Sequence, residues 1–215
     1  MHLVDLPGVG QSAAHGAPSL TAHAAAVRSA VDALGLARYA LLAHDSGGVI
    51  ARLVAADNPQ VWALVLWDTE VPGHHPLFLR LSKLPGFEAL LLASLRIGPL
   101  RRSSLGFGGC FTDARYADGE FGDLFVRPLL ASPRTAAGHF ALFRSADFAS
   151  FVWGSHDPFF PIAKARLMLR EFTHTAAELI EIPGLRAFPH EDHPEALVAA
   201  LLPFLERLVP DLVSS

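Results

Sequence analysis

The spacing of apolar residues changes several times along the chain, and each change predicts an element. Apolar residues recur at helical spacing over residues 20–34, and Gly35 follows as a stop signal. Continuous apolar runs at 39–43 and 61–67 predict buried strands, and residues 47–56 between them predict a helix. Strands that alternate with helices in this way predict an α/β fold with a mostly parallel sheet flanked by helices.

The alternation stops after residue 67 and resumes near residue 150. Residues 71–148 combine Pro-Gly turns with helical segments, which predicts a helical cap inserted into a core of residues 1–70 and 149–215. Outside the segments already named, the pattern predicts the end of a strand at 2–4, cap helices at 87–95 and 121–130, strands at 151–153 and 179–182, and helices at 162–172 and 194–208.

Composition narrows the class of protein. With 51% apolar and 18% charged residues, the 215-residue chain has ample material for one large core. The net charge of −4 gives no basic footprint for nucleic acid. A single cysteine, Cys110, fits a reducing compartment, and the longest apolar run, at 89–95, is too short to span a bilayer. The first residues lack the apolar core of a signal peptide. We therefore expect a cytoplasmic protein without nucleic-acid or membrane partners, and an oligomer remains possible.

Three motifs resemble those of the α/β-hydrolase superfamily and occur in that family's order. Asp-Leu-Pro-Gly-Val-Gly-Gln-Ser at 5–12 is similar to the loop after the family's fourth strand. Ala-His-Asp-Ser-Gly at 43–47 is similar to its nucleophile elbow, and Trp-Gly-Ser-His-Asp at 153–157 resembles the turn after its seventh strand. The resemblance covers nearly the whole chain and implies an α/β-hydrolase core.

Two residues of the elbow, Asp45 and Ser46, are candidate nucleophiles. The strained turn requires small residues two positions before and after the nucleophile. Around Asp45 these are Ala43 and Gly47, whereas around Ser46 the preceding position holds the bulky His44. The segment also resembles the His-Asp-X-Gly-Gly elbow of haloalkane dehalogenases and epoxide hydrolases, in which aspartate attacks. This implies an ester intermediate on Asp45, with the backbone N–H of Ser46 as an oxyanion donor. The alternatives are that Asp45 only caps the next helix, or that Ser46 serves an esterase.

The resemblance also assigns the acid and the base. Asp157 corresponds to the family's triad acid, and Asp68 is the alternative position. The family's histidine falls on Ala187, which cannot abstract a proton. His190 lies three residues later and needs a shifted loop to reach Asp45, so the sequence predicts impaired turnover. If Ala187 occupies the base position, an Ala187→His substitution should raise hydrolysis sharply.

The family's first three strands and its second oxyanion loop lie before the Asp-Leu-Pro-Gly motif, which begins here at residue 5. The family's third strand lies between its fourth and fifth, so its absence leaves a gap whose unpaired backbone groups cost on the order of 1–3 kcal/mol each. Three alternatives follow: the strands close up, another chain fills the gap, or the chain is a truncated fragment.

The expected substrates are small, mostly apolar molecules. Dehalogenases and epoxide hydrolases of this type carry Trp where this chain has Ser46, and epoxide hydrolases use two cap tyrosines where this cap has only Tyr116. No cofactor is expected. His190 and His193 have the spacing of metal ligands but lack a companion cluster, so no metal is expected either. The rival interpretation is a non-catalytic binding relative that keeps the pocket without turnover.

Overall fold

A parallel pair of strands forms the centre of the structure. The computed structural model describes residues 1–10, 12, 19–56, 58–69, 84–104, 106–131, 136, 161–169 and 177–208. Within these residues the sheet consists of β1 (Tyr39–Asp45) and β2 (Val61–Thr69). The register pairs Tyr39 with Val61 and Asp45 with Thr69, so the strands run in parallel and both finish at the same edge. This confirms the predicted α/β class with a parallel sheet.

The two helices of the first half form where the apolar spacing predicted them. Helix α1 (Leu20–Ala33) is capped by Ser19, whose Oγ accepts a hydrogen bond from the N–H of Ala22 at 3.1 Å. It ends just before Gly35, whose φ of 66° favours glycine. Helix α2 (Ser46–Ala55) follows β1 without an intervening residue. One buried apolar cluster joins the two helices: Leu20, Ala24, Val49, Ile50 and Val54.

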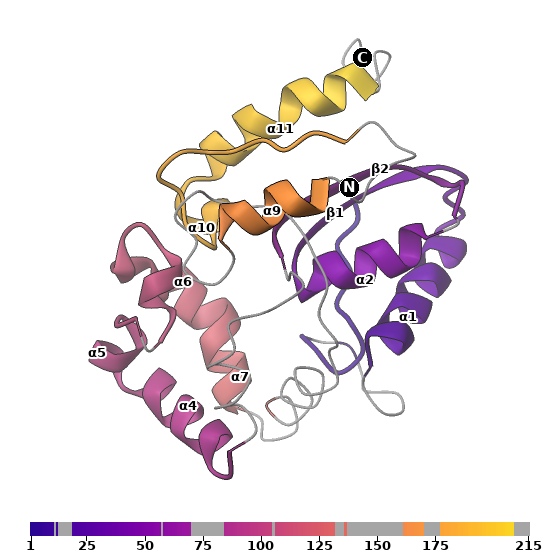
Figure 1. The fold of residues 1–215 in the computed structure, drawn as a ribbon. Helices are drawn as coiled ribbons and strands as arrows, with labels where there is room; N and C mark the ends of the chain where they lie inside the picture. Colours follow the sequence, from indigo (N-terminus) through magenta and orange to yellow (C-terminus); the bar gives the residue numbers. More distant parts are fainter. Residues whose placement is uncertain are drawn as a thin grey trace.

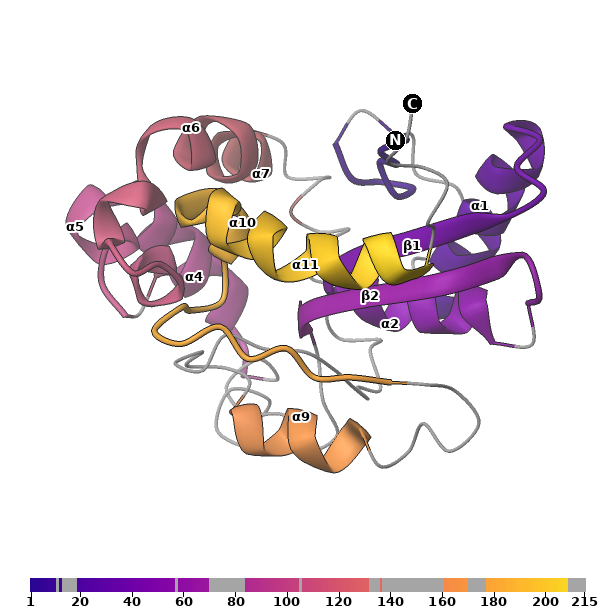
Figure 2. The same ribbon diagram turned by 90° about the horizontal axis from the view of Figure 1, so that it is seen from above.

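Helices cover both sides of the strands. Helices α1 and α2 lie on one side of β1 and β2, and α11 (Pro194–Leu208) crosses the other side (Figures 1 and 2). Helix α9 (Ile162–Met168) places Ala165 in a cluster with Ala51 of α2 and Leu66 of β2. The core is therefore a sheet between helical layers, as in doubly covered parallel sheets.

Short helices gather beyond the edge where β1 and β2 end (Figure 1). They share a buried cluster that includes Leu95, Phe111 and Phe121. Their bounds are α4 (Phe87–Arg96), α5 (Gly98–Arg101), η1 (Phe107–Cys110), η2 (Ala114–Ala117), α6 (Gly119–Phe121), the π-helical η3 (Gly122–Val126) and α7 (Arg127–Ala131). The described part of the segment predicted as a cap is thus helical, and the name cap is kept for these helices, residues 84–104 and 106–131.

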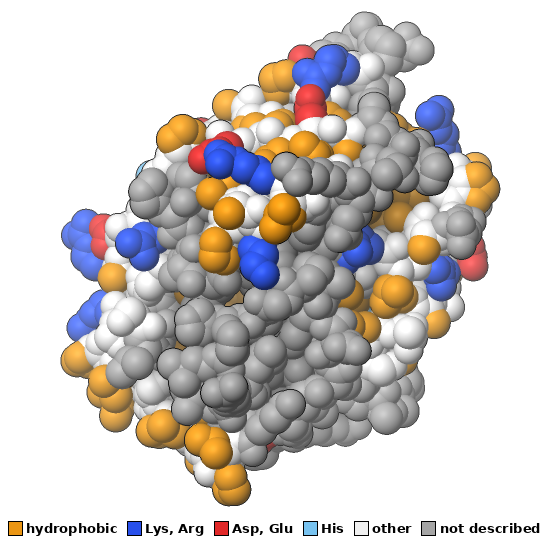
Figure 3. Space-filling model, in the orientation of Figure 1, with side chains coloured by type: hydrophobic (Ala, Val, Ile, Leu, Met, Phe, Trp, Pro, Cys, Tyr) orange, Lys and Arg blue, Asp and Glu red, His pale blue; other side chains and the backbone are white. Residues whose placement is uncertain are grey.

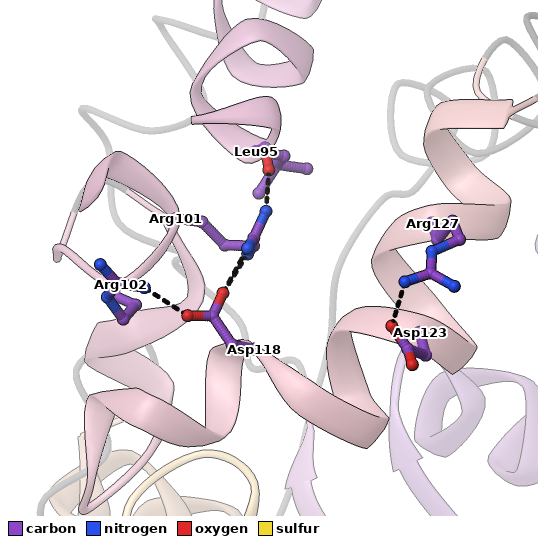
Figure 4. A network of polar contacts seen from close by, with 6 residues as sticks. All are labelled: Leu95, Arg101, Arg102, Asp118, Asp123 and Arg127. Atoms are coloured by element: carbon purple, nitrogen blue, oxygen red, sulfur yellow. Dashed lines mark hydrogen bonds and ion pairs between the residues drawn. The ribbon is translucent and has the colours of Figure 1, made fainter. Parts of the chain in front are cut away.

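One carboxylate joins two turns of this helical part (Figure 4). Oδ1 of Asp118 accepts two hydrogen bonds from Arg101, and Oδ2 accepts one from Arg102. Arg101 also donates to the carbonyl oxygen of Leu95 at 2.7 Å, at the end of α4. The two guanidinium groups hold the pKa of Asp118 below its usual range. The Arg-Arg pair therefore makes contacts within the cap.

Some predicted elements differ from the structure. Residues 2–4 were predicted as a strand end but form no strand, and Leu3 is 86% exposed. Residues 177–181 form no strand and Ile182 forms a single bridge, where the sequence predicted a strand at 179–182. Apolar spacing indicates burial only when a neighbouring segment covers the side chains. The predicted strand at 151–153 lies outside the described residues.

Charged and apolar side chains are mixed on the face of the molecule in Figure 3. On the face in Figure 3, the described Lys and Arg side chains are scattered among apolar ones rather than gathered into one patch. Exposed apolar side chains lie along α4 and α5, including Leu90 and Ile97. Among the described residues, no helix is both long and apolar enough to cross a membrane.

Candidate active site

The turn between β1 and α2 is strained at one residue. Asp45, the last residue of β1, has φ 50° and ψ −134°, while Ser46 already belongs to α2. A non-glycine residue held in such a conformation costs about 1–3 kcal/mol and persists only where its surroundings enforce it. The structure therefore has its sharp strand-to-helix turn at Asp45 and not at Ser46.

Two glycines lie in the first turn of α2, but only one of them stands at a close approach to the strands. A Cβ added at Gly47 would lie 4.0 Å from the Cβ of Ala43, which is an ordinary van der Waals contact. A Cβ added at Gly48 would lie 2.7 Å from the Cβ of Thr69 in β2, closer than side-chain carbons can approach. Gly48 therefore marks the close approach between α2 and β2, whereas Gly47 leaves room for a Cβ beside Ala43.

The end of β2 is irregular beside this turn. The register shifts between the His44–Trp67 and Asp45–Thr69 pairs, so Asp68 is an extra residue in β2. Asp68 is 1% exposed and has φ 40°, and Thr69 is fully buried. The hydroxyl of Thr69 donates a hydrogen bond to the carbonyl oxygen of Asp45.

The loop that follows Ile182 brings Ala187 to β1. The carbonyl oxygen of Ala187 accepts a hydrogen bond from Nε2 of His44 at 2.8 Å. The Ala187 side chain is buried at 3% exposure in the apolar cluster of the cap, with Leu95 and Phe111. The position where the sequence aligned the family's histidine thus lies in an apolar cluster.

Aromatic rings fill the space between this loop and the strands. The rings of His44 and His190 lie 4.4 Å apart between centroids, and His44 also stacks on Trp67 at 5.8 Å. Phe188 lies 5.3 Å from His44 and contacts Phe111 of the cap at 5.2 Å. The loop therefore connects the elbow strand to the apolar interior of the cap.

Burial keeps both imidazoles neutral. It lowers the pKa of His44 from 6.5 to about 4, against the hydrogen bond to Ala187, which raises it. Burial and the neighbouring His44 lower the pKa of His190 to about 3, while Asp192 raises it. The indole N–H of Trp67 donates to Nδ1 of His190 at 3.3 Å, so the neutral ring carries its proton on Nε2.

Polar contacts tie the same loop to the cap. Both the N–H and the hydroxyl of Thr112 donate to Oδ2 of Asp192 at 2.6 Å, and Nε2 of His193 donates to the Thr112 hydroxyl at 2.7 Å. The N–H of Phe188 donates to the carbonyl of Cys110 at 3.1 Å. Asp192 ends α10 (Pro189–Asp192), which carries His190. These bonds fix where His190 lies relative to the cap.

Comparison with known proteins agrees with this arrangement. Residues 1–91 match a family model described as alpha/beta hydrolase fold. A solved α/β-hydrolase fold protein from Burkholderia ambifaria superposes with a TM-score of 0.70 at 22% identity, covering 93% of this chain and 78% of that chain. The chain has an α/β-hydrolase fold.

Two further structures extend this α/β-hydrolase likeness. A malate-bound thermophilic esterase from Thermogutta terrifontis superposes with a TM-score of 0.69 at 18% identity, covering 95% of this chain and 78% of that chain. A hydrolase from Pseudomonas aeruginosa gives 0.68 at 22% identity, covering 94% of this chain and 77% of that chain. No curated protein matches by sequence.

The structure brings together some of the predicted site residues. In this α/β-hydrolase fold, Asp45 and Ser46 form the elbow, Asp68 lies next to it at the end of β2, and His190 packs on His44. Asp157 lies outside the described residues.

The predicted metal-type spacing does not bring its two histidines to one site. His190 contacts Trp67, whereas His193 contacts Thr112. The described ranges contain no group of three or more His, Cys, Asp or Glu residues that could hold a metal ion. These observations give no support for a metal centre in this part of the chain.

Sequence reasoning missed Thr69 and Phe188. Thr69 contacts Asp45 through the strand register, and Phe188 contacts His44 from a loop, so neither contact follows from local spacing. The second glycine of the elbow, Gly48, was the available signal for Thr69, because a glycine inside a helix often marks a close approach.

Proposed function

We propose that this α/β-hydrolase-fold chain is a hydrolase of small, mostly apolar molecules and that Asp45 is its nucleophile. The observation that carries the proposal is the strained backbone of Asp45 at the junction of β1 and α2. This conformation exposes a side chain at the top of the sheet, and strain of this kind clusters at functional sites.

The reaction begins when a carboxylate oxygen of Asp45 attacks an electrophilic carbon. A carbon–oxygen bond forms, and the leaving group departs with the electron pair of the broken bond as a halide or as the alkoxide of an opened epoxide. In the later hydrolysis of this ester, the N–H of Ser46 in the first turn of α2, a position without an acceptor inside the helix, would stabilise negative charge on the carbonyl oxygen of the ester.

Water then attacks the carbonyl carbon of the ester, releasing an alcohol and restoring the carboxylate of Asp45. This step needs a base, and we assign it to His190 with Asp157 as the acid that orients it. In the structure His190 is neutral, and the lone pair on its Nδ1 accepts a hydrogen bond from the indole N–H of Trp67. The ring must leave Trp67 before it can take a proton, so we expect the ester to clear slowly and to accumulate.

Two alternatives remain for the same fold. A non-catalytic binding protein is favoured by the apolar surroundings of Ala187 and by the low proton affinity of His190. An esterase that attacks through Ser46 is suggested by the esterase among the structural neighbours. The strained turn at Asp45 argues against the second alternative, because a serine nucleophile would require the strain one residue later.

Intact-mass analysis after exposure to small epoxides, alkyl halides and esters tests the proposal. We expect an ester adduct on Asp45 from epoxides or halides, lost in Asp45→Asn and kept in Ser46→Ala. An adduct from esters that maps to Ser46 would support the esterase. A folded protein that gives neither adduct nor product would support the binding protein.

A further inference from the structure

Thr69 touches the elbow from the neighbouring strand. It is fully buried at the end of β2, opposite Asp45 in the parallel register. Its hydroxyl donates a hydrogen bond to the carbonyl oxygen of Asp45, and its side chain packs where a Cβ on Gly48 would stand. One side chain therefore contacts both the strained residue and the first turn of α2.

The bulge in β2 creates this contact. His44 pairs with Trp67, but the next residue, Asp45, pairs with Thr69 because Asp68 is extra. Asp68 has φ 40°, so a second strained residue lies beside Asp45 with its φ of 50°. Without the extra residue the register would set Asp68 level with Asp45. The irregular strand end thus brings a hydroxyl to the carbonyl of the elbow.

We infer that Thr69 is a positioning residue, whose hydroxyl holds the backbone of Asp45 in its strained conformation and so orients the Asp45 carboxylate. The inference rests on the proposed function in one respect, namely that the oriented carboxylate is the nucleophile. Its structural half, the control of the Asp45 backbone, stands on the contacts alone.

The chemistry of the contact supports this role. A backbone carbonyl has two lone pairs, so the carbonyl of Asp45 can accept from the first turn of α2 and from Thr69 together. A strained residue persists only where several contacts determine its conformation. Valine has the shape of threonine but no donor, whereas serine keeps the donor and loses only a methyl group. Comparing the valine and serine variants at position 69 therefore separates the effect of the hydrogen bond from the effect of packing.

The test compares Thr69→Val and Thr69→Ser with Val54→Ala, a buried α2 variant that loses packing without touching Asp45. For each folded protein we measure the second-order rate of Asp45 adduct formation with a small epoxide, and φ of Asp45 in a crystal structure. We expect Thr69→Val to react about 10- to 100-fold more slowly, with Asp45 relaxed from its positive φ. Thr69→Ser and Val54→Ala should keep both the rate and the angle.

The other outcomes decide whether Thr69 has this positioning role. A Thr69→Val protein that keeps the positive φ of Asp45 overturns the inference, and so does one that reacts as fast as the wild type. If the wild type forms no adduct, the proposed function fails and the angle alone decides the role of Thr69. If valine prevents folding, Thr69→Ala takes its place with the same expected results.

Discussion

The two glycines of the elbow differ in the space around them, although they are neighbours in one helix. A Cβ at Gly48 would overlap Thr69, so we expect Gly48→Ala to destabilise the protein by about 1–3 kcal/mol through overpacking. Gly47→Ala makes only ordinary contact with Ala43 and should be close to neutral. Urea unfolding of both variants checks the difference. A Gly48→Ala protein as stable as Gly47→Ala would mean that the helix and β2 are farther apart than described.

The contrast between Asp45 and Thr69 also shows how far single residues can be predicted. The small residues on either side of Asp45 are local, so sequence alone favoured Asp45 over Ser46. Thr69 reaches the elbow only because Asp68 is extra in β2, and a one-residue shift in register is not encoded in local spacing. Its role becomes visible only when the strands are paired.

At the scale of elements, the loop at residues 183–188 and the cap share an apolar cluster, and this cluster changes the effect that we expect from a substitution at Ala187. The sequence suggested that Ala187→His restores a base, but Ala187 lies in the cluster with Leu95 and Phe111. An imidazole there overpacks the cluster and buries unpaired nitrogens, so we expect a loss of about 1–3 kcal/mol and no faster hydrolysis. Ala199→His, on the exposed side of α11, is the matched control. A stable Ala187→His protein with faster turnover would restore the sequence-based expectation.

The cap has its own electrostatic contact in Asp118, which bridges Arg101 and Arg102 (Figure 4). We expect Asp118→Asn to cost about 0.5–1 kcal/mol at low salt and less at high salt, because partly exposed pairs are screened. Asp123→Asn breaks a more exposed pair with Arg127 and should be nearly neutral. Thermal unfolding at two salt concentrations distinguishes them. Equal effects of the two substitutions would show that the contacts of Asp118 with Arg101 and Arg102 add no more to stability than the exposed pair does.

At the scale of the whole molecule, the buried imidazoles make stability depend on pH. The pKa values of His44 and His190 are lowered from 6.5 to about 4 and about 3. Between these values and 6.5 the unfolded chain binds protons that the folded chain does not, so stability falls as pH is lowered through this window. We expect the wild type to lose at least about 1 kcal/mol between pH 7 and pH 5, measured by urea unfolding.

The matched control for this pH dependence is His190→Gln, which keeps an acceptor for the indole N–H of Trp67 and removes one titrating group. We expect this variant to lose less stability than the wild type over the same pH range. An equal loss in both proteins would place the pH dependence in other groups.

The class of fold could be predicted from the sequence, but the residues at the edges of the core could not. Apolar runs marked β1 and β2 because both faces of these strands are covered by helices. Leu3 follows the same pattern but is exposed, since burial depends on neighbours that a local pattern does not reveal. The approach of His190 to His44 likewise depends on how the loop folds back onto β1.

The most direct test of the central claim, that Asp45 is the nucleophile of the elbow, is isotope mapping. The protein is incubated in H₂¹⁸O with the epoxide or halide that reacts with it, and the peptide containing residues 43–52 is analysed by mass. Hydrolysis through an ester of Asp45 places ¹⁸O in the Asp45 carboxylate, because water attacks the ester carbonyl. Our account predicts this label in the wild type and in Ser46→Ala. Product formation without label in Asp45, or a covalent adduct on Ser46, would contradict it.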